Sequence, residues 1–123
     1  MEDLRMYCIV SKEALAAMGG NRGKLAAQAG HAFLHAWWSA YQRHKGRSMD
    51  YWGGGNATKI TLICETTKDA IDIAKEHEDI TGVTIVRDAG LTVFKEPTVT
   101  CVGIGPLTKE ECSDKLRALK PLV

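Results

Sequence analysis

A long helical stretch, expected from about residue 22 to about residue 43, limits how this chain can fold more than any other segment. Asn21 stands directly before it and is a typical N-cap residue. Successive residues turn by roughly 100° around a helix, so Lys24, Gln28 and His31 fall on one stripe, which His35 continues. The opposite arc is apolar and consists of Leu25, Ala29, Ala32, Phe33, Ala36 and Ala40. An arc of this width predicts a helix that is buried on more than one side.

The polar stripe indicates a site, because a cation, an amide and an imidazole cost free energy to bury unless they find partners. For His31 a second interpretation stays open, since a histidine on an apolar helix is more often a hydrogen-bonded core residue than a catalytic one. The helix by itself does not separate these two roles.

Four short runs rich in apolar and β-branched residues predict strands: Met6–Val10, Lys59–Cys64, Val83–Arg87 and Val99–Ile104. Capping-box patterns predict two further helices, one over about 66–78 and one that begins at Thr108 and stops before Pro121. The segment after the first strand and the glycine-rich segment 45–57 are predicted as loops, and Gly105-Pro106 is predicted to end the last strand.

The resulting order, β-α-β-α-β-β-α, belongs to the α/β class. Helices between strands favour parallel pairing, whereas the short link between the third and fourth strands permits an antiparallel neighbour. A length of 123 residues suits one domain. We therefore expect a single domain over residues 1–123, built as an α/β/α sandwich with a mixed four-stranded sheet.

Composition excludes several classes of protein. A formal net charge of +1 rules out a chain that is basic throughout, so a nucleic-acid surface has to be a local patch. The chain shows neither a signal-peptide pattern nor an apolar run of roughly 18 residues, which predicts a cytoplasmic protein that does not enter the membrane. The spacing of the four cysteines fits no zinc site, so buried, reduced thiols are expected. Monomer and homodimer both stay open.

The glycines and the lysine at the start of the long helix do not form a nucleotide-binding P-loop. Three residues rather than four separate Gly19 from Gly23, and Leu25 follows Lys24 where a P-loop needs serine or threonine. These departures argue against a nucleoside triphosphatase. A helix N-terminus that carries Lys24 still suits a phosphate group or an oxyanion.

A second candidate group follows the third predicted strand. Asp88 lies directly after that strand, and ligands of open α/β sheets bind beyond the carboxyl ends of the strands. The alternative is that Asp88 forms a turn with Gly90. Thr92, Thr98 and Thr100 are either site residues or residues chosen for strand propensity.

The basic run from Arg43 to Arg47 and the three tryptophans leave RNA contact open. Cations near a helix C-terminus are also favourable because of the helix dipole alone. Trp37, Trp38 and Trp52 either stack on bases or pack in the core, and core packing is the expectation for Trp37.

Three blocks, in this order and spacing, resemble the type 2 peptidyl-tRNA hydrolases of archaea and eukaryotes: R-G-K-L-A-A-Q-A-G-H-A at 22–32, V-R-D-A-G-L-T at 86–92 and T-V-T-C-V-G-I-G-P at 98–106. The resemblance implies hydrolysis of the ester between a peptide and the 3′-terminal ribose of tRNA, which recycles tRNA from stalled or dropped-off translation products. It implies peptidyl-tRNA as the partner, contacted at its 3′ end and acceptor region. It implies no metal and no organic cofactor.

The resemblance also implies the site residues. Four are expected to be catalytic, namely Lys24, His31, Asp88 and Thr98. Four are expected to bind the substrate, namely Arg22, Gln28, Thr92 and Thr100. The chain departs from the family pattern at three places: Arg22 stands for lysine, Leu91 for arginine, and Glu96-Pro97 for Pro-Gly.

An ester is reactive enough for direct attack by water, and this is the mechanism we expect. Asp88, alone or through a threonine hydroxyl, positions and deprotonates the water. Lys24 either stabilises the oxyanion or holds a phosphate, and His31 either orients Asp88 or acts as an acid toward the ribose oxygen. The alternative is an RNA-binding or protein-interaction module that has lost hydrolysis, which Leu91 and Glu96-Pro97 favour.

Overall fold

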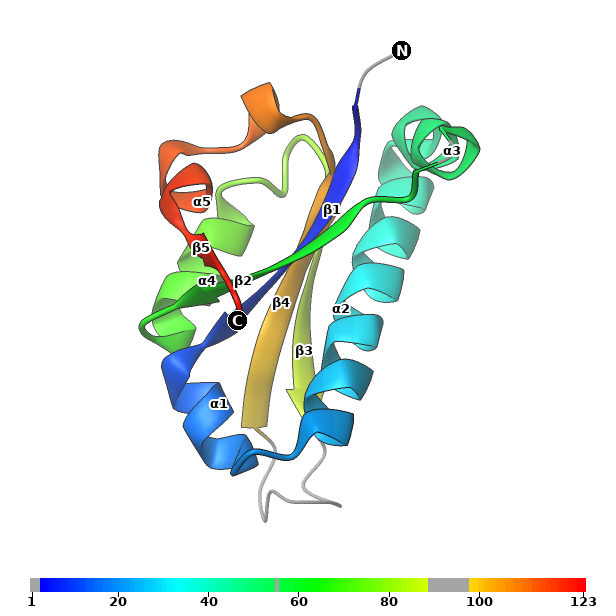
Figure 1. Ribbon diagram of the computed structural model, residues 1–123. Helices are drawn as coiled ribbons and strands as arrows, with labels where there is room; N and C mark the ends of the chain where they lie inside the picture. Colours follow the sequence, from blue (N-terminus) through cyan, green and yellow to red (C-terminus); the bar gives the residue numbers. More distant parts are fainter. Residues whose placement is uncertain (1–2, 55, 89–97) are drawn as a thin grey trace.

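The computed structural model describes residues 3–54, 56–88 and 98–123, which form three layers with a sheet in the middle (Figure 1). The strands are β1 (Arg5–Ser11), β2 (Lys59–Cys64), β3 (Gly82–Asp88), β4 (Thr98–Leu107) and β5 (Lys120–Pro121). The helices are α1 (Lys12–Met18), α2 (Arg22–Arg43), α3 (Lys45–Gly53), α4 (Thr67–Lys75) and α5 (Asp114–Ala118), with a 3-10 turn at Lys109–Glu111. None of the described helices combines the length and the apolar character that a membrane crossing needs.

The sheet has the order β3-β4-β1-β2-β5 and is mixed. β1 and β2 are parallel, whereas the β1–β4, β3–β4 and β2–β5 pairs are antiparallel. Helices α2 and α3 lie on one face of the sheet, and α4 and α5 lie on the other (Figure 1). The predicted α/β class and mixed sheet are confirmed.

The central strand β1 is buried on both faces, and its alternating side chains enter two different cores. Tyr7 and Ile9 pack on the α4 side with Leu62 and Ile104. Cys8 and Val10 pack on the α2 side. The four cysteines are all free and buried, as expected.

The long helix α2 is the best-predicted element, because Asn21 caps it and its buried small residues repeat at helical spacing. It lies unusually close to the sheet. A Cβ atom at Gly103 would overlap the carbonyl oxygen of Ala32, and one at Gly82 would overlap that of Ala36. The two glycines therefore let the helix backbone rest on β3 and β4, which fixes where the start of α2 meets the ends of these strands.

The predicted four-stranded sheet is corrected to five strands, because β5 pairs with Leu62 and Ile63 of β2. Two residues, one of them a proline, carry no strand pattern, and only the neighbouring strand makes them one. β4 also continues through Gly105-Pro106 to Leu107, where the sequence predicted an end. The pairing with β1 shifts register there, and such an irregular point in a ladder tolerates proline.

Two predicted loops are helices. α1 begins at Lys12 and is capped by Ser11, whose hydroxyl accepts a hydrogen bond from the Ala14 amide at 3.0 Å. α3 occupies most of the segment 45–57, because Tyr51 packs against the core and offsets the low helix propensity of the glycines.

The bounds of both predicted capped helices differ from the prediction. α4 has the expected capping box at Thr66 but stops at Lys75. Thr108 caps only a 3-10 turn, and the last helix starts later, with Ser113 as its cap.

Candidate active site at the start of α2

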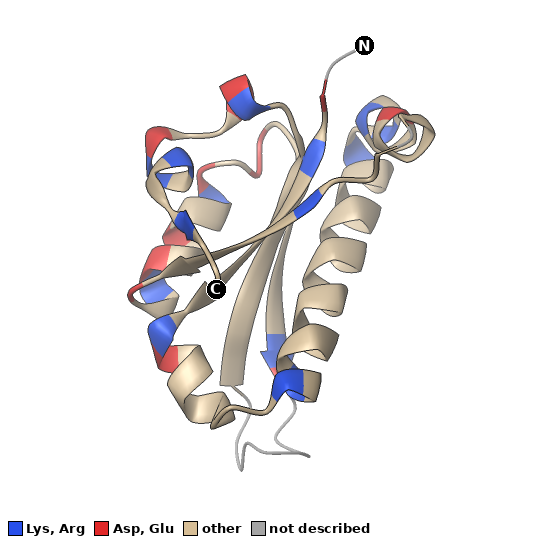
Figure 2. Cartoon of the chain, in the orientation of Figure 1, with Lys and Arg blue, Asp and Glu red and all other residues tan. Residues whose placement is uncertain are grey.

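The first turns of α2 lie over the end of β3 and the beginning of β4, which meet because these strands are antiparallel. Figure 2 shows basic positions at the start of α2 beside the charged end of β3. The rest of α2 carries no charged residue until Arg43. Two of its three charged residues, Arg22 and Lys24, are therefore in the first turn, which lies over the end of β3 and the start of β4.

Lys24 and Asp88 form the central contact of this region. The ammonium Nζ lies 2.5 Å from the Asp88 carboxylate oxygen Oδ2, and the two side chains are only 11% and 3% exposed. Desolvation of two charges is costly, and removal of either partner from such a pair leaves the other buried without a counter-charge. The pair was not predictable from spacing, because 63 residues separate the positions on the chain.

Asn21 fixes the backbone beneath Lys24. Its side-chain oxygen accepts a hydrogen bond from the Lys24 amide at 2.9 Å. The first amides of a helix have no partner within the helix and carry its positive dipole end. Lys24 thus projects from a capped first turn, where a negative charge is favourable.

Gln28, one turn further on, is held by β4 through two contacts. The Thr100 hydroxyl donates to its side-chain oxygen Oε1 at 2.9 Å, and both residues are buried. The Cys101 thiol donates to its backbone carbonyl at 3.4 Å. Gln28 and Thr100 therefore join the helix to the strand, and their predicted contact with substrate stays a prediction.

Thr98, the first residue of β4, pairs directly with Asp88 in the antiparallel register. It is half-buried. The structure thus brings together five of the eight predicted residues, namely Lys24, Gln28, Asp88, Thr98 and Thr100.

Two further predicted residues, Arg22 and His31, have no described contact with this group. Arg22 and His31 are exposed, and the ring contact of His31 is with His35 rather than with Asp88. Thr92, like Leu91 and Glu96-Pro97, lies outside the described residues. The expected orientation of Asp88 by His31 has no support among the described contacts.

The sequence reasoning missed three supporting residues: Cys101, Gly82 and Gly103. The sequence predicts Cys101 only as a buried thiol and Gly103 only as part of the fourth strand, and it assigns Gly82 no role. Their roles depend on which strand lies beneath which turn of α2, and no local signal contains that information.

The basic run at the other end of α2 serves the fold. Arg43 donates to the Thr81 carbonyl at 2.9 Å. Arg47 makes two hydrogen bonds of 2.6 Å to Glu111 and one of 3.0 Å to the Pro106 carbonyl. These hydrogen bonds from Arg47 lower the pKa of Glu111 to about 2. RNA contact is not needed to explain these two arginines.

The tryptophans differ from one another. Trp37 is partly buried and donates its indole N–H to the Ser48 carbonyl at 3.0 Å, which confirms the expected packing role. Trp38 is 51% exposed and stacks on Tyr41, and Trp52 is 73% exposed.

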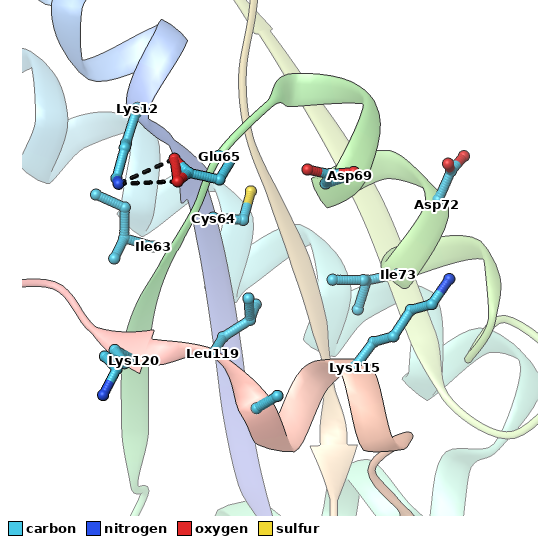
Figure 3. A pocket seen from close by; sticks show the side chains of 11 residues that line it. Lys12, Ile63, Cys64, Glu65, Asp69, Asp72, Ile73, Lys115, Leu119 and Lys120 are labelled. Carbon is cyan, nitrogen blue, oxygen red and sulfur yellow. Dashed lines mark hydrogen bonds and ion pairs between the residues drawn. The ribbon is translucent and has the colours of Figure 1, made fainter.

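Two hollows lie away from the α2–β3 contact. One, of about 450 Å³, lies between β2, α4 and α5. Figure 3 shows side chains that line it, among them the apolar Ile63, Ile73 and Leu119 and the ion pair of Lys12 with Glu65. The other is an apolar groove of about 590 Å³ beside α2, α3 and Lys59. Neither is lined by any of the predicted site residues.

Comparisons with known proteins point in one direction. The model of the family described as "Peptidyl-tRNA hydrolase PTH2" matches residues 4–122. A peptidyl-tRNA hydrolase of Haloquadratum walsbyi is 42% identical over 90 residues, which cover 72% of this chain and 77% of the relative.

Two further relatives carry the same name. The protein of Methanopyrus kandleri is 37% identical over 105 residues, which are 84% of this chain and 87% of the relative. That of Methanocaldococcus jannaschii is 36% identical over 100 residues, which are 80% and 85% of the two chains. The chain therefore belongs to the PTH2 family of peptidyl-tRNA hydrolases.

Proposed function

We propose that this protein hydrolyses the ester that joins a peptide to the 3′-terminal ribose of tRNA, and that residues 1–123 act as one domain in this reaction. The observation that carries the proposal is the buried Lys24–Asp88 pair, in a chain of the PTH2 family. A cation and a carboxylate side by side supply the two charges that ester hydrolysis by water needs. The products are a free peptide and a tRNA ready for reuse.

Asp88 is the base in this scheme. Its carboxylate accepts a proton from a water molecule as that water attacks the ester carbonyl carbon. Thr98 lies opposite Asp88 across the strand pair, so its hydroxyl is placed to hold the same water. Collapse of the tetrahedral intermediate breaks the ester bond, and the ribose oxygen takes up the proton from Asp88.

Lys24 is the electrostatic partner. Its ammonium group orients the Asp88 carboxylate through the ion pair and faces the negative charge that develops on the carbonyl oxygen. Each of these roles is typically worth about 10²–10³ in rate. Two roles were left open for Lys24. Its contact with Asp88, the proposed base, favours stabilisation of the oxyanion over a contact with phosphate.

For His31 we propose a role different from the two that the sequence suggests. At about 1.5 Å per residue, it lies roughly 10 Å along α2 from Lys24. Its imidazole is exposed. We assign it to contact with the substrate beyond the ester, together with the exposed Arg22. Gln28 and Thr100 keep the helix at its distance from β4, and Thr92 stays a proposed substrate contact.

The partner in this proposal is the 3′ end and acceptor region of peptidyl-tRNA, in the cytoplasm. Contact with phosphates releases counterions, so affinity for tRNA should fall steeply with salt concentration. A salt-independent affinity would argue against a polynucleotide substrate.

We propose that a second surface, an exposed apolar patch on α2 and α3, forms the contact of a homodimer. Leu34, Trp38, Met49 and Trp52 are exposed large apolar residues of α2 and α3, with exposures of 62%, 51%, 47% and 73%. Such patches favour protein contacts. Analytical ultracentrifugation of the wild type and of Trp52→Glu tests this; a monomeric wild type would exclude it.

The experiment for the activity is a release assay with purified protein and radiolabelled peptidyl-tRNA. We expect free peptide and tRNA with an intact 3′ end, and a loss of about a hundredfold or more in Lys24→Ala. Lys68→Ala is the matched control, because its ion pair with Asp72 is on the surface of α4. Binding of peptidyl-tRNA without release would indicate a module that has lost hydrolysis.

A further inference from the structure

His31 and His35 stand one turn apart on the exposed flank of α2. Their ring centres are 5.6 Å apart and their planes are tilted by 39°. Both side chains are exposed. Residues at i and i+4 are neighbours on a helix surface, and two histidines at this spacing are a known arrangement for metal ligation. The fold and the proposed hydrolysis explain neither the pairing nor the exposure of His35.

The spacing of the rings suits a chelate. A metal ion held 2.0–2.1 Å from one nitrogen of each ring, at a tetrahedral angle, places the ring centres roughly 5 Å apart. The observed separation of 5.6 Å is within a small side-chain rotation of that value. No lysine or arginine of α2 lies between Lys24 and Arg43, so the helix itself brings no cation against the site.

Among the described residues, the His77 imidazole and the four thiols are occupied or buried. His77 is 2% exposed, and both its ring nitrogens are bonded, to the Ile73 carbonyl at 2.8 Å and to the Ser113 amide at 3.0 Å. The four thiols are buried, with exposures from 1% to 6%. No group of three or more metal-ligating side chains occurs in the described part of the chain. His44 is partly exposed but stands alone, whereas His31 and His35 offer two exposed imidazoles side by side.

We propose that His31 and His35 form a two-histidine site for a divalent late transition metal ion such as Zn²⁺, Ni²⁺ or Cu²⁺, with water completing the coordination. The site is distinct from catalysis, which needs no metal in the proposed mechanism. Its occupation inhibits hydrolysis, because the ion takes up the imidazole that His31 offers to the substrate. This second part rests on the proposed function; the binding itself does not.

Selectivity follows from ligand chemistry. Imidazole suits zinc, copper and nickel, and affinity rises from Mn²⁺ to Cu²⁺ along the first transition series. Mg²⁺ and Ca²⁺ prefer oxygen ligands and should not bind. A site made only of surface charge would not show this order.

Isothermal titration of the untagged full chain with ZnCl₂ and NiCl₂ tests the binding. We expect one ion per chain, at least tenfold weaker binding in His35→Ala, and unchanged binding in the control His44→Ala. The double variant His35→Ala with Leu34→His moves the ligand to the i+3 position and should restore binding, because Leu34 is exposed. Absence of saturable binding, or equal binding by His35→Ala and wild type, would overturn the site.

The release assay tests the inhibition. Saturating Zn²⁺ should reduce peptide release by the wild type at least tenfold and reversibly with EDTA, whereas His35→Ala should keep its activity under the same conditions. Saturable binding without inhibition of the wild type would overturn the inhibitory role. A wild type inactive even without metal would instead contradict the proposed function, while the titration still decides the site.

Discussion

The two ends of α2 use the same kind of contact for different purposes. Just beyond the C-terminal end, in the first turn of α3, Arg47 meets Glu111 through two hydrogen bonds of 2.6 Å, and Glu111 also accepts from the Thr108 amide at 2.9 Å. That carboxylate is fully engaged by the fold. At the N-terminal end, Lys24 and Asp88 meet where a helix dipole and a strand terminus converge. We therefore propose that an ion pair can be architectural or catalytic according to where it lies, not according to its residue types.

The largest expected effect is on the rate, at the N-terminal end. Asp88→Asn removes the base while keeping the side-chain shape, so release of peptide should fall by about 10²–10³-fold. Single-turnover kinetics with labelled peptidyl-tRNA measure it. Circular dichroism has to show a folded variant, since Lys24 loses its counter-charge. Retention of at least a third of the wild-type rate would mean that Asp88 is not the base.

The next effect is on stability, at the C-terminal end. Arg47→Ala removes both bonds to Glu111 and the one to the Pro106 carbonyl, and should lower the free energy of unfolding by about 2 kcal/mol. Urea unfolding measures this loss. The folded variant should release peptide at the wild-type rate. A large loss of rate would contradict the assignment of Arg47 to the fold alone.

The pH dependence of the free energy of unfolding is a further property expected of the Arg47–Glu111 contact. The pKa of Glu111 is lowered to about 2, first of all by its hydrogen bonds from Arg47. A carboxyl whose pKa is lower in the folded state stabilises the fold fully above its unfolded pKa of about 4.5, and this is lost as the pH falls toward 2. With allowance for solvent screening, between about 1 and 2 kcal/mol is expected.

Urea unfolding of wild type and Glu111→Gln at pH 7, 4 and 3 follows this contribution. The gap between the two proteins should narrow as the pH falls. A gap that is constant with pH would show that the charge of Glu111 does not stabilise the fold.

The smallest effect is on the surface. Lys68 and Asp72 form an i,i+4 pair at 2.7 Å, with side-chain exposures of 83% and 48%. Exposed pairs of this kind contribute little to stability, because water and salt screen the two charges. Lys68→Ala should therefore change neither the urea midpoint nor the rate of peptide release measurably, and a large change in either would show that surface pairs cannot serve as controls.

Periodic and capped elements could be predicted from the sequence. α2 begins after Asn21 and ends at Arg43 as expected, and β2 has its predicted bounds. Both carry their signal locally, in helical spacing and in a run of β-branched residues. α3 and β5 could not be predicted, because Tyr51 packing and the edge of β2 create them.

The candidate site shows the same limit. The position of Asp88 at the end of a strand follows from the local pattern, but its contact with Lys24 depends on the strand register and on the close approach at Gly82 and Gly103. A helical wheel places His31 beside Lys24 in angle. It does not show that β3 is an edge strand of the sheet. Because no further strand of the described chain lies beyond β3, this side of α2 is exposed to solvent.

The most direct test is the rate of peptide release by Lys24→Ala and Arg47→Ala, measured side by side under conditions where both are folded. If the catalytic centre is at the start of α2, Lys24→Ala loses about a hundredfold or more while Arg47→Ala stays within about twofold of the wild type. Equal losses in the two variants, or full activity of Lys24→Ala, would contradict the account.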